Sequence, residues 1–383
     1  MLKVYFHMYF PREEEKELLP RLGRKEAMAL IGPRRAGKTT LAKRLASLWE
    51  GKGGKSAYID LESMGAPATP AELETEIEKT PSGSLVAIDE VQALGGWVKA
   101  VRGQIEAGKR HLIISGSSAS LLSSEIATSL AGRAIPAQIL PLSYHDAKAW
   151  GVKGVGQYIH TGGYPECVLR PSDANELHKV YFELAVLRDV AARHGVREQK
   201  PLYDLARIML SEPGKRISAK KTSEALGISQ PTFRSYVQWL NDAFLLLSVP
   251  PEVRSPREKI VADAKHYAYD TGLAQSVSSS ASEEKGRRLE NIVAVELVRR
   301  GYSLSYFAGN DFECDFIARA SGKDALAVQV YSAEGALPER ESAGLAAAIR
   351  AFKCRGLLVS LHELDAKGFG FEILTAEKWL LGK

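Results

Sequence analysis

A glycine-rich stretch near the amino terminus constrains the fold of this chain more than any other feature. Residues 29–41 read Ala-Leu-Ile-Gly-Pro-Arg-Arg-Ala-Gly-Lys-Thr-Thr-Leu, which contains the spacing G-x-x-x-x-G-K-[ST] of a phosphate-binding loop. Glycines let the backbone curl so that consecutive N–H groups point at phosphate oxygens. An apolar run precedes the loop and leucines at helical spacing follow it, so the sequence predicts strand, loop and helix in that order.

This arrangement predicts that the chain binds ATP together with Mg²⁺. Lys38 is expected to reach the β- and γ-phosphates, and the Thr39 hydroxyl is expected to ligate Mg²⁺. The helix that begins near Lys38 would present its positive end to the same anion. The residues expected to contact the nucleotide are Gly32, Pro33, Arg34, Arg35, Ala36, Gly37, Lys38, Thr39 and Thr40.

Another predicted strand, residues 84–90, ends in two acids. Four apolar residues lead into Asp89 and Glu90, which is the pattern of a Walker B strand. Asp89 is expected in the Mg²⁺ shell, and Glu90 is expected to orient and deprotonate a water molecule. The alternative is a strand that ends in acids by chance.

Two more residues are candidates for the same site. The apolar strand that begins at His111 ends in small polar residues, of which Ser117 is the candidate for sensing the γ-phosphate; an ordinary Ser-rich turn is the alternative. Arg133 is a candidate for contacting phosphate in its own or a neighbouring subunit of a homo-oligomer, with a surface arginine as the alternative. Four strands separated by helices predict an α/β fold whose parallel sheet holds the nucleotide at the strands' carboxyl ends.

With these motifs identified, the sequence resembles the prokaryotic AAA-type P-loop ATPases. It is similar to those members whose C-terminal half has long been classed as a domain of unknown function. The resemblance covers nearly the whole chain and implies ATP hydrolysis. Besides the P-loop, the stretches that carry it are residues 58–62, 88–92, 115–118, 132–134, 140–144, 162–166 (Gly-Gly-Tyr-Pro-Glu lies here) and 187–190.

Residues 197–248 predict a helix-turn-helix. A capped helix ends at Gly227, and a long amphipathic helix is expected from Gln230 to Leu247. Between residues 197 and 240 there are eight Lys/Arg against four Asp/Glu, which favours contact with DNA. A structural joint or a protein contact is the alternative. The residues expected to face DNA are Lys220, Lys221, Gln230, Thr232, Arg234 and Ser235, and those expected to pack inward are Phe233, Tyr236, Val237 and Leu240.

The last hundred residues predict a separate α/β unit that resembles the restriction-endonuclease-like PD-(D/E)XK fold. Glu290 is expected on a helix and Asp315 on a hairpin strand. Active members of that fold use two carboxylates to hold Mg²⁺ and a lysine to assist attack by water. Here Gln329 stands where the second carboxylate belongs and Tyr331 where the lysine belongs. We therefore expect a nuclease-like domain without cleavage activity; a metal site of Glu290 and Asp315 alone is the alternative.

Length and composition set the remaining expectations. The chain of 383 residues carries a net charge of +5 and lacks any run of the roughly 18 apolar residues that a membrane span needs. Its three cysteines lack metal-ligand spacing, which favours the reducing cytoplasm. Residues 251–262 are interpreted as a linker or wing and 274–285 as a loop. The predicted domains are an AAA-type ATPase domain at 1–150, a helical connector at 151–196, a winged-helix or helix-turn-helix-like domain at 197–262, and the nuclease-like domain at 263–383.

Together these features predict an Mg²⁺-dependent ATPase that binds duplex or branched DNA and acts in DNA repair, recombination or the handling of mobile elements. Two alternatives stay open. One is a regulatory nucleotide switch that acts on a protein partner, and the other is an ATPase-coupled nuclease.

Overall fold

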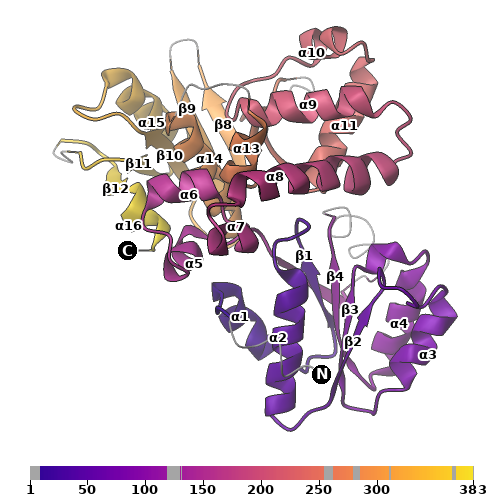
Figure 1. Cartoon of the computed structure of the whole chain (residues 1–383). Coiled ribbons are helices and arrows are strands. Elements are labelled where there is room, and N and C mark those ends of the chain that lie inside the picture. Colours follow the sequence, from indigo (N-terminus) through magenta and orange to yellow (C-terminus); the bar gives the residue numbers. More distant parts are fainter. Residues whose placement is uncertain are drawn as a thin grey trace. The chain divides into compact units, whose positions relative to one another are not determined.

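The computed structural model describes residues 9–118, 130, 132–253, 262–278, 285–309, 312–364 and 368–382 (Figure 1). The chain forms two compact units. The N-terminal unit ends at Leu142 and also includes residues 242–244, and the C-terminal unit comprises the rest, from Ser143 onward. Within the described residues, none of the helices has both the length and the apolar character needed to cross a bilayer.

The N-terminal unit is built on a five-stranded sheet in which every pairing is parallel. The strands lie in the order β2-β3-β4-β1-β5, so β4 separates the strand before the glycine loop from the strand that carries the two acids. The strands are β1 (Ala27–Ile31), β2 (Ser56–Asp60), β3 (Leu85–Asp89), β4 (His111–Gly116) and β5 (Ala134–Gln138).

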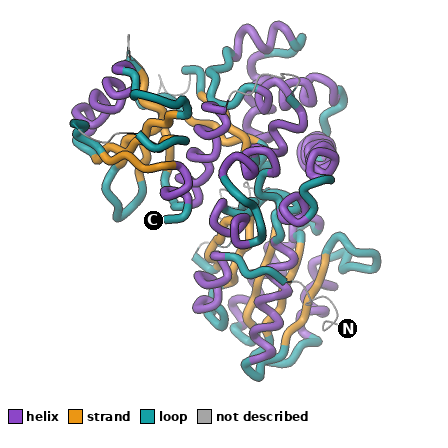
Figure 2. Tube along the Cα trace, turned by 60° about the vertical axis from the view of Figure 1, so that its left-hand side comes forward, coloured by secondary structure: helices purple, strands orange, loops and turns teal. Residues whose placement is uncertain are grey.

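Helices lie along both faces of this sheet (Figures 1 and 2). Leu41 and Leu45 of the helix that follows the glycine loop are at most 1% exposed, and they pack with Met28, Leu30 and Leu85 of the sheet. Burying a leucine fully contributes about 1.5–3 kcal/mol, so this face fixes the helix firmly on the strands. The helices are α1 (Glu13–Leu18), α2 (Lys38–Gly51), α3 (Pro70–Glu78) and α4 (Trp97–Ala107).

The four strands predicted for this unit are confirmed, and β5 is an addition. Pro136 and the polar end of this short segment hid its strand character from the sequence pattern. As an edge strand, β5 pairs only with β1, where a proline is tolerated.

The C-terminal unit starts with helices. They are α5 (Tyr144–Ala149), α6 (Val155–Thr161), α7 (Pro165–Leu169), α8 (Ala174–Glu183) with a π-helical continuation over Leu184–Ala192, α9 (Gln199–Ser211), α10 (Ala219–Ala225) and α11 (Gln230–Asp242). An antiparallel pair follows, β6 (Leu246–Val249) with β7 (Lys265–Ala268), and then α13 (Thr271–Val277).

Two sequence predictions in this region were wrong in their bounds. The helix from Gln230 ends at Asp242, because Phe244 takes a positive φ of 56° and Leu246 and Leu247 enter strand β6. Residues 274–277, expected in a loop, form the C-terminal part of helix α13. Asp270 caps the first turn of this helix, where its carboxylate accepts the Leu273 N–H at 2.8 Å. Most of the remaining predicted loop, 279–284, and most of the predicted linker or wing, 254–261, lie outside the described residues.

A second sheet, in the order β12-β11-β10-β9-β8, completes this unit. Strands β8, β9 and β10 pair antiparallel, and β10, β11 and β12 pair parallel. The elements are α14 (Lys285–Arg299), β8 (Ser303–Ala308), β9 (Glu313–Arg319), β10 (Leu326–Tyr331), α15 (Glu339–Phe352), β11 (Arg355–Ser360), β12 (Glu372–Thr375) and α16 (Ala376–Leu380). The sequence predicts helices at 289–300 and 340–352 and strands at 304–307, 313–318, 325–331 and 356–360. The structure has these elements and adds β12 and α16.

The three segments predicted as separate domains after residue 150 pack into this one unit. Helix α13 packs on α8 and α9, and α14 packs on β7 and on the second sheet. The antiparallel pair β6–β7 therefore belongs to the same core as the elements on both sides of it in the sequence.

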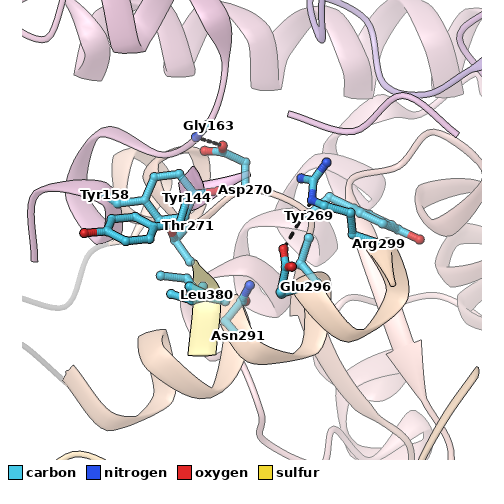
Figure 3. A pocket seen from close by; sticks show the side chains of 12 residues that line it. Tyr144, Tyr158, Gly163, Tyr269, Asp270, Thr271, Asn291, Glu296, Arg299 and Leu380 are labelled. Carbon is cyan, nitrogen blue, oxygen red and sulfur yellow. Dashed lines mark hydrogen bonds and ion pairs between the residues drawn. The ribbon is translucent and has the colours of Figure 1, made fainter. Parts of the chain in front are cut away.

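The Gly-Gly-Tyr-Pro stretch has a structural explanation in this core (Figure 3). The Gly163 N–H donates to the Asp270 carboxylate at 2.6 Å, beside a small cavity of about 20 Å³. Gly162 has φ of 63°, and a Cβ there would lie 2.1 Å from an Asp270 oxygen. Only glycine allows the backbone to come this close to the Asp270 carboxylate. The motif therefore lets the turn between α6 and α7 pack against the start of α13.

Candidate functional site

The glycine loop lies between the end of β1 and the start of α2, as the motif requires. Gly37 has φ of 93°, in the left-handed region that glycine favours. At Gly32 a Cβ would lie 1.8 Å from the Ile139 carbonyl oxygen, so a side chain has no room there. Both glycines of the motif are therefore needed for the loop to close over the helix N-terminus.

Lys38 is held in this loop by backbone carbonyls. Its ammonium group donates to the carbonyl oxygens of Gly32 and Pro33, both at 2.9 Å, and the residue is 3% exposed. This cradle keeps the positive charge of Lys38 beside the loop N–H groups, where an anionic ligand would bind.

Asp89 is surrounded by hydroxyl donors. The Thr39 hydroxyl and the Tyr58 hydroxyl each donate to Asp89 Oδ2 at 2.6 Å, and the Ser115 hydroxyl donates to Oδ1. Burial, reinforced by the hydrogen bond to Asp89, raises the pKa of Tyr58 above its usual value, so Tyr58 remains a donor. The structure thus brings together Thr39 and Asp89, the two predicted Mg²⁺ ligands.

Tyr58 and Ser115 were not predicted at this site; both lie in stretches that carry the family resemblance, but the sequence assigned neither of them a role. They reach Asp89 because β2 and β4 are the two neighbours of β3 in the sheet. A sequence reading that placed both strands beside β3 would have found them.

Glu90 lies next to Asp89 in an unusual backbone conformation. Its φ and ψ are 53° and 50°, a left-handed conformation that costs a non-glycine residue about 1–3 kcal/mol. The Gln92 side-chain amide donates to Glu90 Oε2 and to the Ser117 hydroxyl, the latter at 3.2 Å. Gln92, to which the sequence assigned no role, therefore links the predicted base to the predicted sensor.

Arg133 lies at the amino ends of the parallel strands, opposite the glycine loop, so its predicted contact with phosphate of its own subunit is wrong. Its carbonyl oxygen accepts the Ala27 N–H at 2.8 Å, at the amino end of β1, and its guanidinium pairs with Glu106 at 3.2 Å. The five residues of β1 span about 16 Å between this point and the glycine loop. A contact with a neighbouring subunit stays a prediction.

The loop residues predicted to contact the nucleotide differ in their exposure and in their contacts. Arg34 forms a two-bond ion pair with Glu62, at 3.0 and 3.1 Å, which ties the loop to the segment after β2. Arg35 and Thr40 are exposed. The remaining donors fit ATP and Mg²⁺: the loop and Lys38 suit phosphate, and a hydroxyl beside a carboxylate suits a hard cation.

The predicted DNA-facing residues gather on α10 and α11. Lys220, Lys221, Gln230 and Arg234 are exposed, and Thr232 is half-buried with its N–H bonded to the Ser229 hydroxyl at 3.1 Å. As predicted, Phe233, Tyr236 and Leu240 are buried, whereas Val237 is only half-buried. The antiparallel pair β6–β7 follows these helices directly.

Glu290 and Asp315 also lie together, but their surroundings differ from those expected. Lys265 of β7 contacts both carboxylates, at 3.0 and 3.5 Å. Gln329 accepts the Asp315 N–H at 3.2 Å and donates to Glu341 at 2.6 Å. The Tyr331 hydroxyl donates to the Ala336 carbonyl at 3.3 Å. Lys265 was missed because a lysine inside an otherwise buried strand is not recognisable from its neighbours alone.

Comparison with known proteins identifies two segments of the chain. Residues 24–147 match a family model described as an AAA domain, and residues 152–284 match a domain of unknown function, DUF8612. Both matches end before residue 285. The AAA match covers the sheet, the glycine loop and the two acids described above.

Two curated proteins are similar over most of their length. The uncharacterized protein MJ1544 of Methanocaldococcus jannaschii is 32% identical over 316 residues, which cover 76% of this chain and 70% of that protein. An uncharacterized protein of Haemophilus influenzae is 30% identical over 325 residues, covering 79% and 81%. Among solved structures, AMPPCP-bound DnaA from Aquifex aeolicus matches 60% of this chain and 86% of its own with 13% identity and a TM-score of 0.31. A similarity of that size carries no information on ligands.

Proposed function

We propose that this chain, which belongs to the same family as MJ1544 of Methanocaldococcus jannaschii and carries an AAA domain, is an Mg²⁺-dependent ATPase. The observation that carries the proposal is the contact between the Thr39 hydroxyl and the Asp89 carboxylate, at 2.6 Å, beside the buried ammonium of Lys38. A hydroxyl, a carboxylate and a lysine at the mouth of a glycine loop are the groups that a magnesium–triphosphate complex requires.

Each side chain has a distinct task in this proposal. The loop N–H groups and Lys38 bind the phosphates, and Thr39 and Asp89 would hold the metal, which would supply charge neutralisation at the phosphate oxygens. Glu90 accepts a proton from the attacking water. The Gln92 amide donates hydrogen bonds to both Ser117 and Glu90. A change at the γ-phosphate that moves Ser117 is therefore transmitted to Glu90 through Gln92.

We further propose that the ATPase binds duplex or branched DNA through the region 197–262, in a pathway of DNA repair, recombination or mobile-element handling. Support comes from the order of α10, a short turn and α11, which is that of a helix-turn-helix. The antiparallel pair β6–β7 follows, as in a winged helix, with β7 just beyond residue 262. Exposed Lys220, Lys221 and Arg234 give this surface positive charge.

The DNA-binding proposal predicts a charge-dependent affinity. Lys220→Glu/Lys221→Glu should weaken duplex binding and flatten its salt dependence, because each lost phosphate contact removes roughly 0.9 from the slope of log affinity against log salt. Fluorescence anisotropy at several salt concentrations measures both quantities. The matched control is Lys109→Glu/Lys153→Glu, a double reversal outside this region; an unchanged slope in the Lys220/Lys221 variant would assign α10 and α11 a purely structural role.

An ATPase assay with single-stranded, duplex and branched DNA tests the whole proposal and separates it from the second candidate function, a nucleotide switch for a protein partner. The hydrogen bond from the Gln92 amide to the Glu90 carboxylate favours that second candidate, since it occupies an oxygen that would otherwise accept a proton from water. Turnover that rises with DNA supports the first function. Slow turnover that ignores DNA supports the switch, and no turnover contradicts both.

For the C-terminal region, residues 263–383, we propose a nuclease-like fold without cleavage activity. The order of helix α14, strands β8 to β10, helix α15 and strand β11 supports this fold. Location in the cytoplasm is also a proposal; it rests on the three free cysteines, Cys167, Cys314 and Cys354.

A further inference from the structure

The carboxylates of the nuclease-like region surround a lysine of the same chain. Lys265, the first residue of β7, is 4% exposed. Its Nζ lies 2.6 Å from a Glu313 oxygen, 3.0 Å from Glu290 Oε1 and 3.5 Å from Asp315 Oδ1. These acids come from α14 and from β9, so a single ammonium group joins three elements of the C-terminal unit. We call Lys265, Glu290, Glu313 and Asp315 the lysine cluster.

The other partners of the acids complete a closed network. Glu290 Oε1 also accepts the Tyr267 hydroxyl at 2.6 Å, and Asp315 Oδ2 accepts the Val330 N–H at 2.9 Å. Arg216 pairs with Glu313. Three carboxyl groups thus face two cations, and their oxygens have donors on more than one side.

The charge of Lys265 is maintained by its neighbours. Burial alone lowers the pKa of an ammonium group, but Glu290, Asp315 and Glu313 raise the pKa of Lys265 above its usual value. Burial and the nearby charge of Glu290 raise the pKa of Asp315, which agrees with Asp315 having the longest contact to Lys265. The ammonium is therefore a lasting positive charge at neutral pH.

A divalent metal does not fit the lysine cluster while Lys265 is present. Mg²⁺ binds carboxylate oxygens at about 2.0–2.1 Å and needs them to converge on one point. In this structure the point on which the three carboxyl groups converge is Lys265 Nζ. Two cations at that point would repel each other in a buried environment where screening by water is weak.

We infer that the ammonium group of Lys265 is the resident cation of the lysine cluster and excludes the divalent metal that a nuclease-like domain would hold there. The metal is therefore excluded by Lys265 and not by the two substitutions singled out in the sequence, Gln329 and Tyr331. Installing an acid and a lysine at those positions therefore does not create a metal site as long as Lys265 remains. Removing Lys265 does, because Glu290, Glu313 and Asp315 then face each other without the ammonium group between them.

The test is Mn²⁺ binding to the full chain, measured by electron paramagnetic resonance without nucleotide. All variants carry Asp89→Asn, which removes the candidate metal ligand of the N-terminal unit and keeps the two sites apart. We expect the Asp89→Asn protein to show no Mn²⁺ bound at the lysine cluster, and Lys265→Met to gain one bound Mn²⁺. Adding Asp315→Asn to Lys265→Met should abolish the gain. The Gln329→Glu/Tyr331→Lys variant, with Lys265 kept, should bind none.

Two outcomes overturn the inference. One is Mn²⁺ binding by the Asp89→Asn protein, or by its Gln329→Glu/Tyr331→Lys derivative, that disappears with Asp315→Asn. The other is a folded Lys265→Met protein that gains no Mn²⁺. Because buried acids without a cation can prevent folding, Lys265→Met/Glu313→Gln serves as a second variant with one charge fewer. Its thermal midpoint should rise when Mn²⁺ is added, whereas that of the Asp89→Asn parent should not change.

Discussion

The two units each contain a buried lysine near a buried aspartate, and the two sites differ in what faces the carboxylate. Among the described residues of the N-terminal unit, the side chains that donate to Asp89 are the hydroxyls of Thr39, Tyr58 and Ser115, while Lys38 donates to loop carbonyls. In the lysine cluster, Lys265 contacts the carboxylates themselves.

This difference separates a site whose carboxylate faces uncharged donors from a site whose carboxylates face a cation. Hydroxyl donors carry no charge, so they leave the place of a cation beside Asp89 to the Mg²⁺ that we propose binds there. An ammonium in direct contact neutralises its partners and is strongly held in a buried environment. In the function proposed here, the same residue types would therefore produce a reactive site in one unit, whereas they form an ionic joint in the other, according to where the lysine lies.

The largest effect is expected for Glu90→Gln. If the N-terminal site is the reactive one, the amide cannot accept a proton from water, and the turnover number should fall by about 10²–10⁴-fold while ATP still binds. Steady-state hydrolysis and nucleotide titration measure the two properties. Gln92→Ala, which removes the amide that holds Glu90, is the companion variant and should leave turnover measurable. Equal turnover in Glu90→Gln and wild type would remove Glu90 from its proposed role.

Removing the lysine of the N-terminal site sharpens the comparison. Lys38→Ala should lower kcat/KM for ATP by about a hundredfold or more, because it removes the cation of the phosphate cradle. Its stability should change less than that of a Lys265 variant, since the Gly32 and Pro33 carbonyls that accept from Lys38 carry no charge. Lys52→Ala, an exposed lysine just beyond α2, is the control for activity. Loss of the fold in Lys38→Ala would show that this lysine, like Lys265, is structural.

A pH effect on stability is expected near the lysine cluster. Burial lowers the pKa of His266, the neighbour of Lys265 on β7, to about 4. Between the ordinary pKa of roughly 6.5 and 4 the unfolded chain binds a proton that the folded chain does not. The folded state should therefore lose about 2 kcal/mol of stability between pH 7 and pH 5, roughly thirtyfold in the unfolding equilibrium.

Urea unfolding at the two pH values measures this loss. His266→Gln cannot take up the proton, so its stability should depend less on pH over this range than that of the wild type. Parallel curves for the two proteins would contradict a neutral, buried His266.

The smallest effects come from a matched pair of tyrosines. Tyr58 and Tyr267 each donate to a carboxylate at 2.6 Å, one in each site. Tyr58→Phe should change ATP turnover or its Mg²⁺ requirement by a few-fold and leave stability nearly intact, because Tyr58 is only half-buried. Tyr267→Phe should cost about 1–3 kcal/mol of stability and leave turnover unchanged. The reverse pattern would contradict the assignment of one reactive and one structural site.

Much of the fold could be predicted from the sequence because its signals are local. The glycine loop, the apolar strands and the cap of α10 are each specified within about ten residues, and the structure has them where the pattern put them. The predictions that failed involved long-range structure. The helix from Gln230 was extended into β6 because Leu246 and Leu247 suit either structure until β7 pairs with them. Arg133 was misplaced because β5 was not recognised.

The sequence by itself determined the phosphate cradle and the acids, since covalent spacing places Gly32, Lys38 and Thr39 on one loop and Asp89 at the end of one strand. Only the tertiary structure decided what surrounds them. Tyr58 and Ser115 reach Asp89 through the order of strands in a sheet, and Lys265 reaches Glu290 and Asp315 across 25 and 50 residues of chain. Such encounters depend on the total burial energy of the packed elements, which no short stretch of residues encodes.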